Sequence, residues 1–461
     1  MGILAAFMVP HPPIIVPEVG KGEEKKIADT VRAYQEVGKR IGELEPETIV
    51  MISPHQVMYA DYFHISPGEG AYGDMGRFHA GNVKFRVTYD VPFVEKLCRL
   101  AAINRLPAGT LGEREKALDH GTMVPLYFVD RYVGEYRLVR IGLSGLSFGK
   151  HYGLGQCIRK AAEALGRRTV VIGSGDLSHR LKEDGPYGYR AEGPAYDKRV
   201  MEVMGHAAFD GLFGFSGEFC EQAGECGHRS FLILAGALDG TEVKAEALSY
   251  EGPFGVGYGI CSYLPIGENP QRNFLERYGE EERRRMAAQR EREDAYVRLA
   301  RRTIEEYVRN GHIAEIPKGL PEEMYRTQAG VFVSIKEDGR LRGCIGTIRA
   351  VRASVAEEIV ENAVSACSRD PRFSPVGEDE LEHLSISVDV LGDMEKIDSM
   401  AQLDVKRYGV VVTKGSKRGL LLPNLEGVDT VEEQVAIAKE KAGIGAGEEA
   451  GMERFEVVRH H

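Results

Sequence analysis

The sequence has few cysteines, no long apolar run and no excess of basic charge. Its cysteines number seven and are spread widely, which argues against the disulfide framework of a secreted protein and favours reduced thiols in the cytoplasm. No stretch approaches the roughly 18 consecutive apolar residues of a transmembrane helix. The first 20 residues also lack the basic n-region of a signal peptide. We therefore expect a cytoplasmic protein that does not engage a membrane.

The charge balance is acidic, with 59 Lys and Arg against 70 Asp and Glu and a net charge of −11. This disfavours binding of nucleic acid by the whole chain, although a local basic patch remains open. The 461 residues are 43% hydrophobic and 28% charged, as in globular proteins. At about 150 residues per domain, the length predicts two or three domains.

Residues 1–265 alternate strand-like runs rich in Val and Ile with amphipathic helical stretches. Such alternation predicts an α/β domain whose central sheet is mainly parallel and buried. A last run in this region, GVGYGICSYLP, predicts a closing strand. The main strand-like runs before it are residues 3–9, 48–54, 137–145 and 169–176.

The composition changes after Pro265, and residues 266–290 predict a charged helical linker. A second, smaller domain then covers residues 291–459. It starts with an amphipathic helix and continues with the strand-like runs GVFVSIK, SISVDVL, GVVVTKG and GLLLP, between which two helices fall. The pattern predicts an α+β domain. We assign no role to the terminal His460 and His461.

Three histidines directly follow strand-like runs of the first domain: His11, His55 and His179. The carboxyl ends of parallel strands form the crevice in which sites lie. A single histidine there is more often structural, but three in equivalent places can converge on a transition metal. A fourth, His120, follows Asp119 in LDHGTMVPLYF. It stands either in a loop that pre-orients its ring or at a helix entry.

The segment GECGHRSF offers three potential metal ligands at a predicted helix N-terminus: Glu225, Cys226 and His228. A helix N-terminus lowers the pKa of a thiol and favours the thiolate, which is the form that binds metals. The alternative is that Cys226 is an ordinary buried thiol.

Five motifs of the first domain occur in the same order as in a known enzyme family: MVPHPPIIVPEVG, ISPH, DHGTMVPLYF, GSGDLSH and EGPFGVGYGICSYLP. Together they resemble the class III extradiol ring-cleavage dioxygenases of the LigB type, over residues 1–265. In that family two histidines and one glutamate hold ferrous iron. The resemblance implies that His11 and His55 are ligands, that His179 is the acid/base residue and that His120 lies in the substrate pocket.

Two further positions of this domain have alternative interpretations. Asp176 either orients His179 or caps a helix. The third ligand departs from the family pattern, because ECGHR resembles the related Memo family, in which a cysteine takes the place of the glutamate. Cys226 is therefore the first choice and Glu225 the second. We expect ferrous iron, with zinc or copper as the alternatives that a softer thiolate admits.

Two motifs of the second domain, RLRGCIGT and ACSRDPRFSPV, combine polar and small residues. Arg342 could hold an anion, and Cys344 is either a nucleophile or a structural thiol. Asp370 and Arg372 form either part of a site or a capped turn with an ion pair. Both motifs resemble the AMMECR family, for which LRGCIGT is the hallmark.

These observations lead to three hypotheses of function. The first is a metal-dependent oxidoreductase that acts on a small aromatic substrate and carries an AMMECR-like accessory domain. The second is a non-enzymatic binding or scaffold protein on a dioxygenase fold, which the ECGHR departure favours. The third is a two-domain modifier of a nucleic acid or protein. The last hypothesis involves a radical-SAM protein as partner, because the resemblance links both domains to such a system and no CxxxCxxC motif is present. The chain could also form a homo-oligomer.

Overall fold

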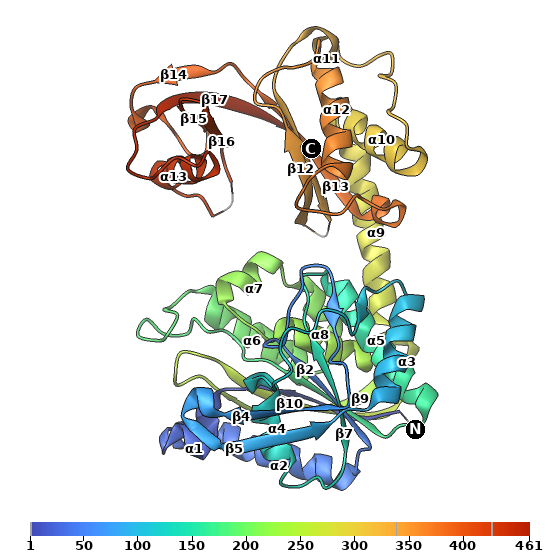
Figure 1. Ribbon diagram of the computed structural model, residues 1–461. Coiled ribbons are helices and arrows are strands. Elements are labelled where there is room, and N and C mark those ends of the chain that lie inside the picture. Colours follow the sequence, from blue (N-terminus) through green and yellow to red (C-terminus); the bar gives the residue numbers. More distant parts are fainter. Residues whose placement is uncertain (1, 338, 426) are drawn as a thin grey trace. The chain divides into compact units, whose positions relative to one another are not determined.

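The computed structural model describes residues 2–337, 339–425 and 427–461, which form two compact units. The first unit comprises Met1–Glu280 and the second Glu281–His461 (Figure 1). Helix α9, Phe274–Arg292, contains the boundary and is formed by the charged segment of the sequence. None of the helices in the described part of the chain is long and apolar enough to cross a membrane.

The first unit is built on a six-stranded sheet with the strand order β7-β2-β8-β1-β10-β9. Strands β7, β2, β8 and β1 are parallel, whereas β10 and β9 add antiparallel pairs at one side. This arrangement confirms the predicted α/β domain with a mainly parallel sheet. The strands are β1 (Ile3–Val9), β2 (Thr48–Ser53), β7 (Arg137–Gly142), β8 (Thr169–Ser174), β9 (Thr241–Glu251) and β10 (Tyr258–Glu268).

Helices cover both faces of this sheet, so that β2 and β8 are buried throughout and β1 is buried from Ala5 onward. Successive side chains of a strand point to opposite faces. In β1, accordingly, Ala6 and Met8 join one apolar core, while Phe7 and Val9 join the other. The helices of the unit are α1 (Pro17–Gly20), α2 (Ala28–Leu44), α3 (Val91–Ile103), α4 (His120–Val129), α5 (Phe148–Leu165), α6 (Glu192–Gly205), α7 (Gly217–Ala223) and α8 (His228–Ala237). Residues of α2 and α4 pack into one core, and those of α3, α5 and α8 into the other.

Short elements of the first unit were not expected from the sequence. They include the hairpin of β4 (Gly70–Met75) and β5 (Ala80–Thr88), and the pair β3 (Phe63–His64) and β6 (Ala108–Gly109). The single-turn helices are η1 (Pro13–Ile15), η2 (Glu23–Ile27), η3 (Gly76–Phe78), η4 (Phe209–Gly214) and η5 (Pro270–Arg272).

The parallel register places the carboxyl ends of three central strands at one edge of the sheet. Val9 of β1 faces Ser174 of β8, and Ile52 of β2 faces Gly173 of the same strand. The three segments that follow these strands therefore leave the sheet side by side. They carry His11, His55 and the pair Asp176 and His179, as the crevice argument predicts.

The second unit has an antiparallel sheet with the order β12-β11-β13-β17-β15-β16, and β14 also pairs with β17. Together with its helices, this sheet confirms the predicted α+β domain. The strands are β11 (Val331–Glu337), β12 (Arg340–Gly346), β13 (Leu384–Leu391), β14 (Glu395–Ile397), β15 (Tyr408–Lys414), β16 (Lys417–Leu421) and β17 (Gly451–His460). The helices are α10 (Ala295–Asn310), α11 (Glu322–Arg326), α12 (Val355–Ser368) and α13 (Val431–Lys441), with single turns η6 (Glu378–His383) and η7 (Met400–Gln402).

The last strand, β17, joins the two halves of this sheet. Its first part pairs with β14 and β15, and its last part pairs with β13 (Figure 1). His460, to which we assigned no role, is part of this strand. Its ring stacks on Tyr296 with the centroids 3.7 Å apart, and its Nδ1 lies 2.5 Å from Asp294 Oδ2. The strand thus ties the C-terminus to the first helix of the unit.

Candidate functional site

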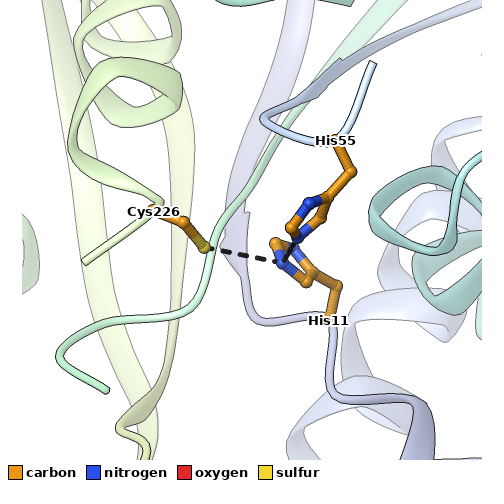
Figure 2. A group of neighbouring side chains, drawn as sticks. All are labelled: His11, His55 and Cys226. Atoms are coloured by element: carbon orange, nitrogen blue, oxygen red, sulfur yellow. Dashed lines mark hydrogen bonds between the residues drawn. The ribbon is translucent and has the colours of Figure 1, made fainter. Parts of the chain in front are cut away.

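Three side chains from distant parts of the chain meet at the sheet edge: His11, His55 and Cys226. One ligand atom of each lies within 4.8 Å of those of the others. The Nε2 atoms of His11 and His55 are 2.9 Å apart, and Cys226 Sγ lies 3.6 Å from His11 Nε2. Figure 2 shows the thiol pointing at the two imidazoles from the opposite side. Within the described residues, this is the group whose ligand atoms could hold a metal ion.

The His11 ring is fixed in the tautomer that a metal requires. Its Nδ1 lies 2.9 Å from Ser174 Oγ, and this hydroxyl donates its own proton to the carbonyl of Gly121 at 2.6 Å. Ser174 Oγ can therefore only accept from the ring, so the ring proton sits on Nδ1 and the lone pair of Nε2 is free. The ring is buried, and burial together with the neighbouring His55 lowers its pKa well below the ordinary value. The imidazole is thus neutral.

Ser174→Ala removes this anchor without touching a ligand atom. We expect metal affinity to fall about 10- to 100-fold, because outer partners of a ligating histidine contribute to that extent. Competition for the metal with a chromophoric chelator measures the change. Ser178→Ala is the matched control, because Ser178 Oγ donates to the Ala223 carbonyl rather than to a candidate ligand. Equal affinity in wild type and Ser174→Ala would contradict the tautomer argument.

His55 follows a turn that a buried ion pair supports. Its backbone N–H donates to Ser53 Oγ at 3.2 Å, and that hydroxyl donates to Asp119 Oδ1 at 2.5 Å. Arg140, a buried residue of β7, donates to Asp119 Oδ2 from Nε and Nη2, at 3.2 and 2.8 Å. Burial alone would raise the pKa of Asp119, but Arg140 and the hydrogen bonds outweigh it and hold that pKa below its ordinary value. Asp119 is therefore an ionised carboxylate, and it supports the turn that carries His55.

His120 is the first residue of α4, and Asp119 caps this helix by accepting from the N–H of Thr122 at 3.0 Å. The helix-entry interpretation is thus the one that the structure supports. The ring nevertheless reaches the cluster, because it stacks on His55 with the centroids 4.0 Å apart. Burial and the neighbouring histidines lower the pKa of His120 to about 3. It therefore offers a neutral imidazole beside the two candidate ligands.

Cys226 reaches the cluster because two loops approach closely at glycines. A Cβ on Gly175 would lie 2.1 Å from Gly227 Cα, so glycine is needed there. The N–H of Asp176 lies 3.3 Å from Cys226 Sγ, which fixes the thiol. The expected lowering of the thiol pKa is wrong for the metal-free chain. Burial raises it well above the ordinary value, and the charges of Asp176 and Glu225 add to this.

Glu225, the second choice for the third ligand, faces another way. Its Oε2 accepts the N–H of His228 at 2.6 Å, at the start of α8. The carboxylate thus serves the helix end, where an anion is favoured. His228 itself is buried, and its Nε2 lies 3.1 Å from the Leu212 carbonyl. Of the three residues in the motif, only Cys226 belongs to the cluster of ligand atoms.

His179 and Asp176 lie in the segment after β8. His179 Nδ1 contacts the Gly224 carbonyl, which can only accept, so the proton sits on Nδ1 and Nε2 is a base. Tyr187, an exposed residue, stands edge-on to this ring at 5.2 Å. Asp176 caps no helix, because the next helix, α6, begins at Glu192. Its Oδ1 instead accepts the backbone N–H of His11 at 2.7 Å, and burial raises its pKa to about 6.

The donor set and its spacing fit a transition metal. Bonds of about 2.0–2.3 Å from nitrogen and sulfur to one ion, at angles of about 90–110°, place the donor atoms about 2.8–3.6 Å apart. The observed separations of 2.9 and 3.6 Å agree with this range. His11 and Cys226 come from buried or partly buried positions, whereas His55 is exposed, so the cluster has an open side. These residues can therefore hold an ion that solvent or a small molecule can reach.

Sequence reasoning missed the residues that support this cluster. Ser174, Gly121 and Arg140 act through hydrogen bonds between distant segments, and nothing in their local sequence points to such partners. Phe78 was also missed, although its ring lies 5.5 Å from that of His120. Of these residues, Ser174 is the one that the sequence could best have indicated, because it directly precedes the GDLSH stretch of a recognised motif.

In the second unit, the structure joins three of the four residues that the sequence singled out: Cys344, Asp370 and Arg372. Cys344 lies on β12, and its backbone N–H donates to Asp370 Oδ2 at 2.9 Å. Arg372 binds Asp370 through Nε and Nη2, at 2.9 and 2.7 Å, and its Nη2 also donates to the Cys344 carbonyl at 3.0 Å. Arg342 instead binds Glu380 and the carbonyls of Ser374 and Pro375. It holds a loop and is not free for an anion.

Asp370 makes the second unit sensitive to acid. The hydrogen bond from Arg372 lowers the pKa of Asp370 to about 2, whereas an unfolded chain has about 3.9. The ionised form stabilises the fold above the unfolded pKa, and this contribution is lost as the pH falls through the folded pKa. We expect urea unfolding of Asp370→Asn and of wild type to differ most above pH 4 and to converge towards pH 2. A difference independent of pH would contradict this prediction.

Comparisons with known proteins confirm the family resemblance that the motifs predicted for each of the two domains. Residues 5–261 match the family model described as the catalytic LigB subunit of aromatic ring-opening dioxygenase, and residues 297–460 match the AMMECR1 model. Protein CA_C1420 of Clostridium acetobutylicum is 43% identical over 469 residues, covering 100% of this chain and 99% of that protein. A Thermotoga maritima protein is 49% identical over 170 residues, covering 36% of this chain and 98% of its own length.

Two solved structures are also similar. One is uncharacterized protein PH0010 from Pyrococcus horikoshii, at 34% identity and a TM-score of 0.34, covering 36% of this chain and 88% of that chain. The other is uncharacterized protein JW3007 from Escherichia coli, at 14% identity and a TM-score of 0.38, covering 57% of this chain and 99% of that chain. The LigB model matches more than half of the chain. The chain therefore belongs to the family of the catalytic LigB subunit of aromatic ring-opening dioxygenases, and an AMMECR1 domain follows in the same polypeptide.

Proposed function

We propose that the first unit is a metal-dependent oxidoreductase that acts on a small aromatic molecule with neighbouring hydroxyl groups. The observation that carries the proposal is the convergence of His11 Nε2, His55 Nε2 and Cys226 Sγ at the carboxyl edge of the sheet. Membership of the LigB family supports the reaction class. Ferrous iron is the proposed ion, with zinc or copper as the alternatives for a site with a thiolate.

His11, His55 and Cys226 would hold the ion, and their surroundings prepare them for it. Ser174 directs the lone pair of His11 inward, and the turn supported by Asp119 places His55 beside it. Deprotonation of the partly buried Cys226 thiol would accompany binding, because the thiolate is the form that binds metals. When bound, the ion supplies Lewis-acid and redox chemistry to the substrate.

His179 is the proposed acid/base residue. Its Nδ1–H is held by the Gly224 carbonyl, so Nε2 is free to accept a proton from a substrate hydroxyl and to return it later. His120 is neutral and stacked on His55, so it can orient a substrate by one hydrogen bond.

The experiment combines metal analysis with oxygen uptake on the full chain. We expect about one transition metal per chain after anaerobic loading with ferrous iron, and oxygen uptake with catechols. His179→Gln should keep the metal but lose turnover by about 100-fold or more, as expected for removal of a general base. Absence of a stoichiometric metal would overturn the proposal. A protein that binds zinc and takes up no oxygen with any catechol would favour the binding or scaffold function instead.

A further inference from the structure

Asp197 of α6 is a buried carboxyl group that binds the segment carrying His179. Its Oδ1 accepts the backbone N–H of Ser178 at 2.8 Å, and its Oδ2 accepts the hydroxyl of Tyr250 at 2.7 Å. The residue is 1% exposed, and none of the groups that shift its pKa is a cation. Burying a carboxyl group without a cationic partner is costly, and an apolar side chain of similar volume would avoid that cost. This cost indicates a role beyond packing.

The segment between β8 and His179 is anchored along its length by hydrogen bonds. At its start, the N–H of Gly175 donates to the Val9 carbonyl at 2.9 Å. In its middle, the N–H of Leu177 donates to the Gly257 carbonyl at 2.9 Å, and the N–H of Gly257 donates to the Ser178 carbonyl at 2.8 Å. The remaining N–H, that of Ser178, is the one that Asp197 accepts. Ser178 directly precedes His179, so this bond acts at the backbone from which the imidazole extends.

The surroundings of Asp197 are built to receive its ionised carboxylate. A Cβ on Gly257 would lie 2.0 Å from Asp197 Oδ2, so only glycine permits this approach. Burial raises the pKa of Asp197 to about 7, whereas the hydrogen bonds from Ser178 and Tyr250 act in the opposite direction. Hydrogen bonds lower the pKa of a carboxyl group when they stabilise its charged form. The two donors therefore hold the carboxylate in place.

His179 is consequently fixed at two points. The contact of Nδ1 with the Gly224 carbonyl sets the rotation of the ring, and the bond between Ser178 and Asp197 sets the backbone. A general base must lie within hydrogen-bond reach of the proton that it takes. Misplacement of a reacting group by about 1 Å can slow a reaction about 100-fold. A residue that holds this backbone therefore bears on the reaction without touching the substrate.

We propose that Asp197 is a positioning residue for His179, whose imidazole it places beside the candidate ligands by holding the N–H of Ser178. The inference rests on the proposed function, because that function gives His179 its acid/base role. The acceptor oxygen of Asp197 performs the task. An asparagine at this position offers the same oxygen to Ser178 and an N–H to Tyr250, so it should replace the aspartate.

Hydrogen exchange of the full chain, read by mass spectrometry at about pH 8, tests the positioning without turnover. At this pH a carboxyl group with a pKa of about 7 is mostly ionised. The peptide that contains Ser178 should exchange about 10- to 100-fold faster in Asp197→Ala, as for loss of a hydrogen bond to a charged group. Asp197→Asn should resemble wild type. Tyr250→Phe changes a half-exposed residue and should give a smaller increase, which decides the test if Asp197→Ala does not fold.

Asp239 supplies a matched control, because it is also buried and has the same kinds of partner. It accepts the hydroxyl of Tyr152 at 2.7 Å and the backbone N–H of Phe274 at 2.9 Å. Asp239→Ala should therefore leave the exchange of the Ser178 peptide unchanged. Metal per chain should stay as in wild type in every variant, because none of the substitutions removes a candidate ligand.

Oxygen uptake with a catechol shows whether Asp197 acts through His179. We expect Asp197→Ala to lower turnover about 10- to 100-fold, and Asp197→Asn to restore most of it. The double variant Asp197→Ala with His179→Gln should be no slower than His179→Gln alone, because residues that act as a unit are not additive. A general structural defect would instead multiply the two losses, as Asp239→Ala with His179→Gln should if Asp239→Ala slows turnover at all.

Several results would overturn the inference. They are unchanged exchange of the Ser178 peptide in Asp197→Ala or, if that variant does not fold, in Tyr250→Phe; an Asp197→Asn variant as impaired as Asp197→Ala; multiplied losses in the double variant; and loss of the metal in Asp197→Ala. If wild type takes up no oxygen with any catechol while exchange changes as expected, the proposed function fails but the positioning of His179 by Asp197 stands.

Discussion

Replacing Cys226 by alanine is expected to abolish stoichiometric metal binding by the first unit. The substitution removes one of three ligand atoms, so affinity should fall by more than the roughly 10- to 100-fold that loss of an outer partner costs. Cys226 Sγ lies 3.6 Å from His11 Nε2, and no other sulfur belongs to the cluster of ligand atoms in the described residues. Metal per chain after loading and desalting, determined by elemental analysis, measures the effect.

The neighbouring residue supplies a matched control for this prediction. Glu225→Gln keeps an oxygen that can accept the N–H of His228, so α8 should start as before. We expect this variant to bind metal as wild type does. If Glu225→Gln lost the metal while Cys226→Ala kept it, the third ligand would be the carboxylate, and the loop would have to rearrange on binding. Circular dichroism of both variants checks that the fold persists.

Arg140→Met is expected to destabilise the first unit by about 3–5 kcal/mol at neutral pH, which is the usual cost of leaving one partner of a buried ion pair alone. The side chains of Arg140 and Asp119 are 2% and 10% exposed, so water cannot replace the lost partner. Asp119 also accepts from Ser53, which is part of the turn before His55. The substitution should therefore loosen one candidate ligand as well.

The pH dependence of this stability loss shows whether the unpaired carboxylate of Asp119 is its cause. Arg140 is a main reason that the pKa of Asp119 is lowered in the fold, so that its ionised form contributes stability above the unfolded pKa. In Arg140→Met this contribution disappears, and the deficit should shrink as acid protonates Asp119. Hydrogen exchange of β2 and β7 peptides, read by mass spectrometry, reports on the first unit alone. The double variant Arg140→Met with Asp119→Asn should recover part of the loss, and a deficit that is the same at all pH values would contradict the prediction.

Local patterns predicted most of the regular structure. The apolar runs at residues 3–9 and 169–176 became β1 and β8, because strands buried on both faces are apolar throughout. The hairpin of β4 and β5 was not predicted, although β5 alternates the buried Phe85 and Val87 with exposed polar residues, as a strand with one buried face does. Strand β17 escaped prediction because only Phe455 of its ten residues is buried. Its place in the sheet is determined by pairing with β13 and β15.

The sequence by itself determined that His11 and His55 follow parallel strands. Apolar runs that alternate with helical stretches predict parallel strands, and the polar residues after each run mark its end. It left Cys226 and Glu225 as alternatives for the third metal ligand. Only the tertiary structure decided that Cys226 faces the imidazoles and that Glu225 turns to the helix end. Neighbours in a loop point in different directions, and that direction depends on the contact between Gly175 and Gly227, two residues from distant parts of the chain.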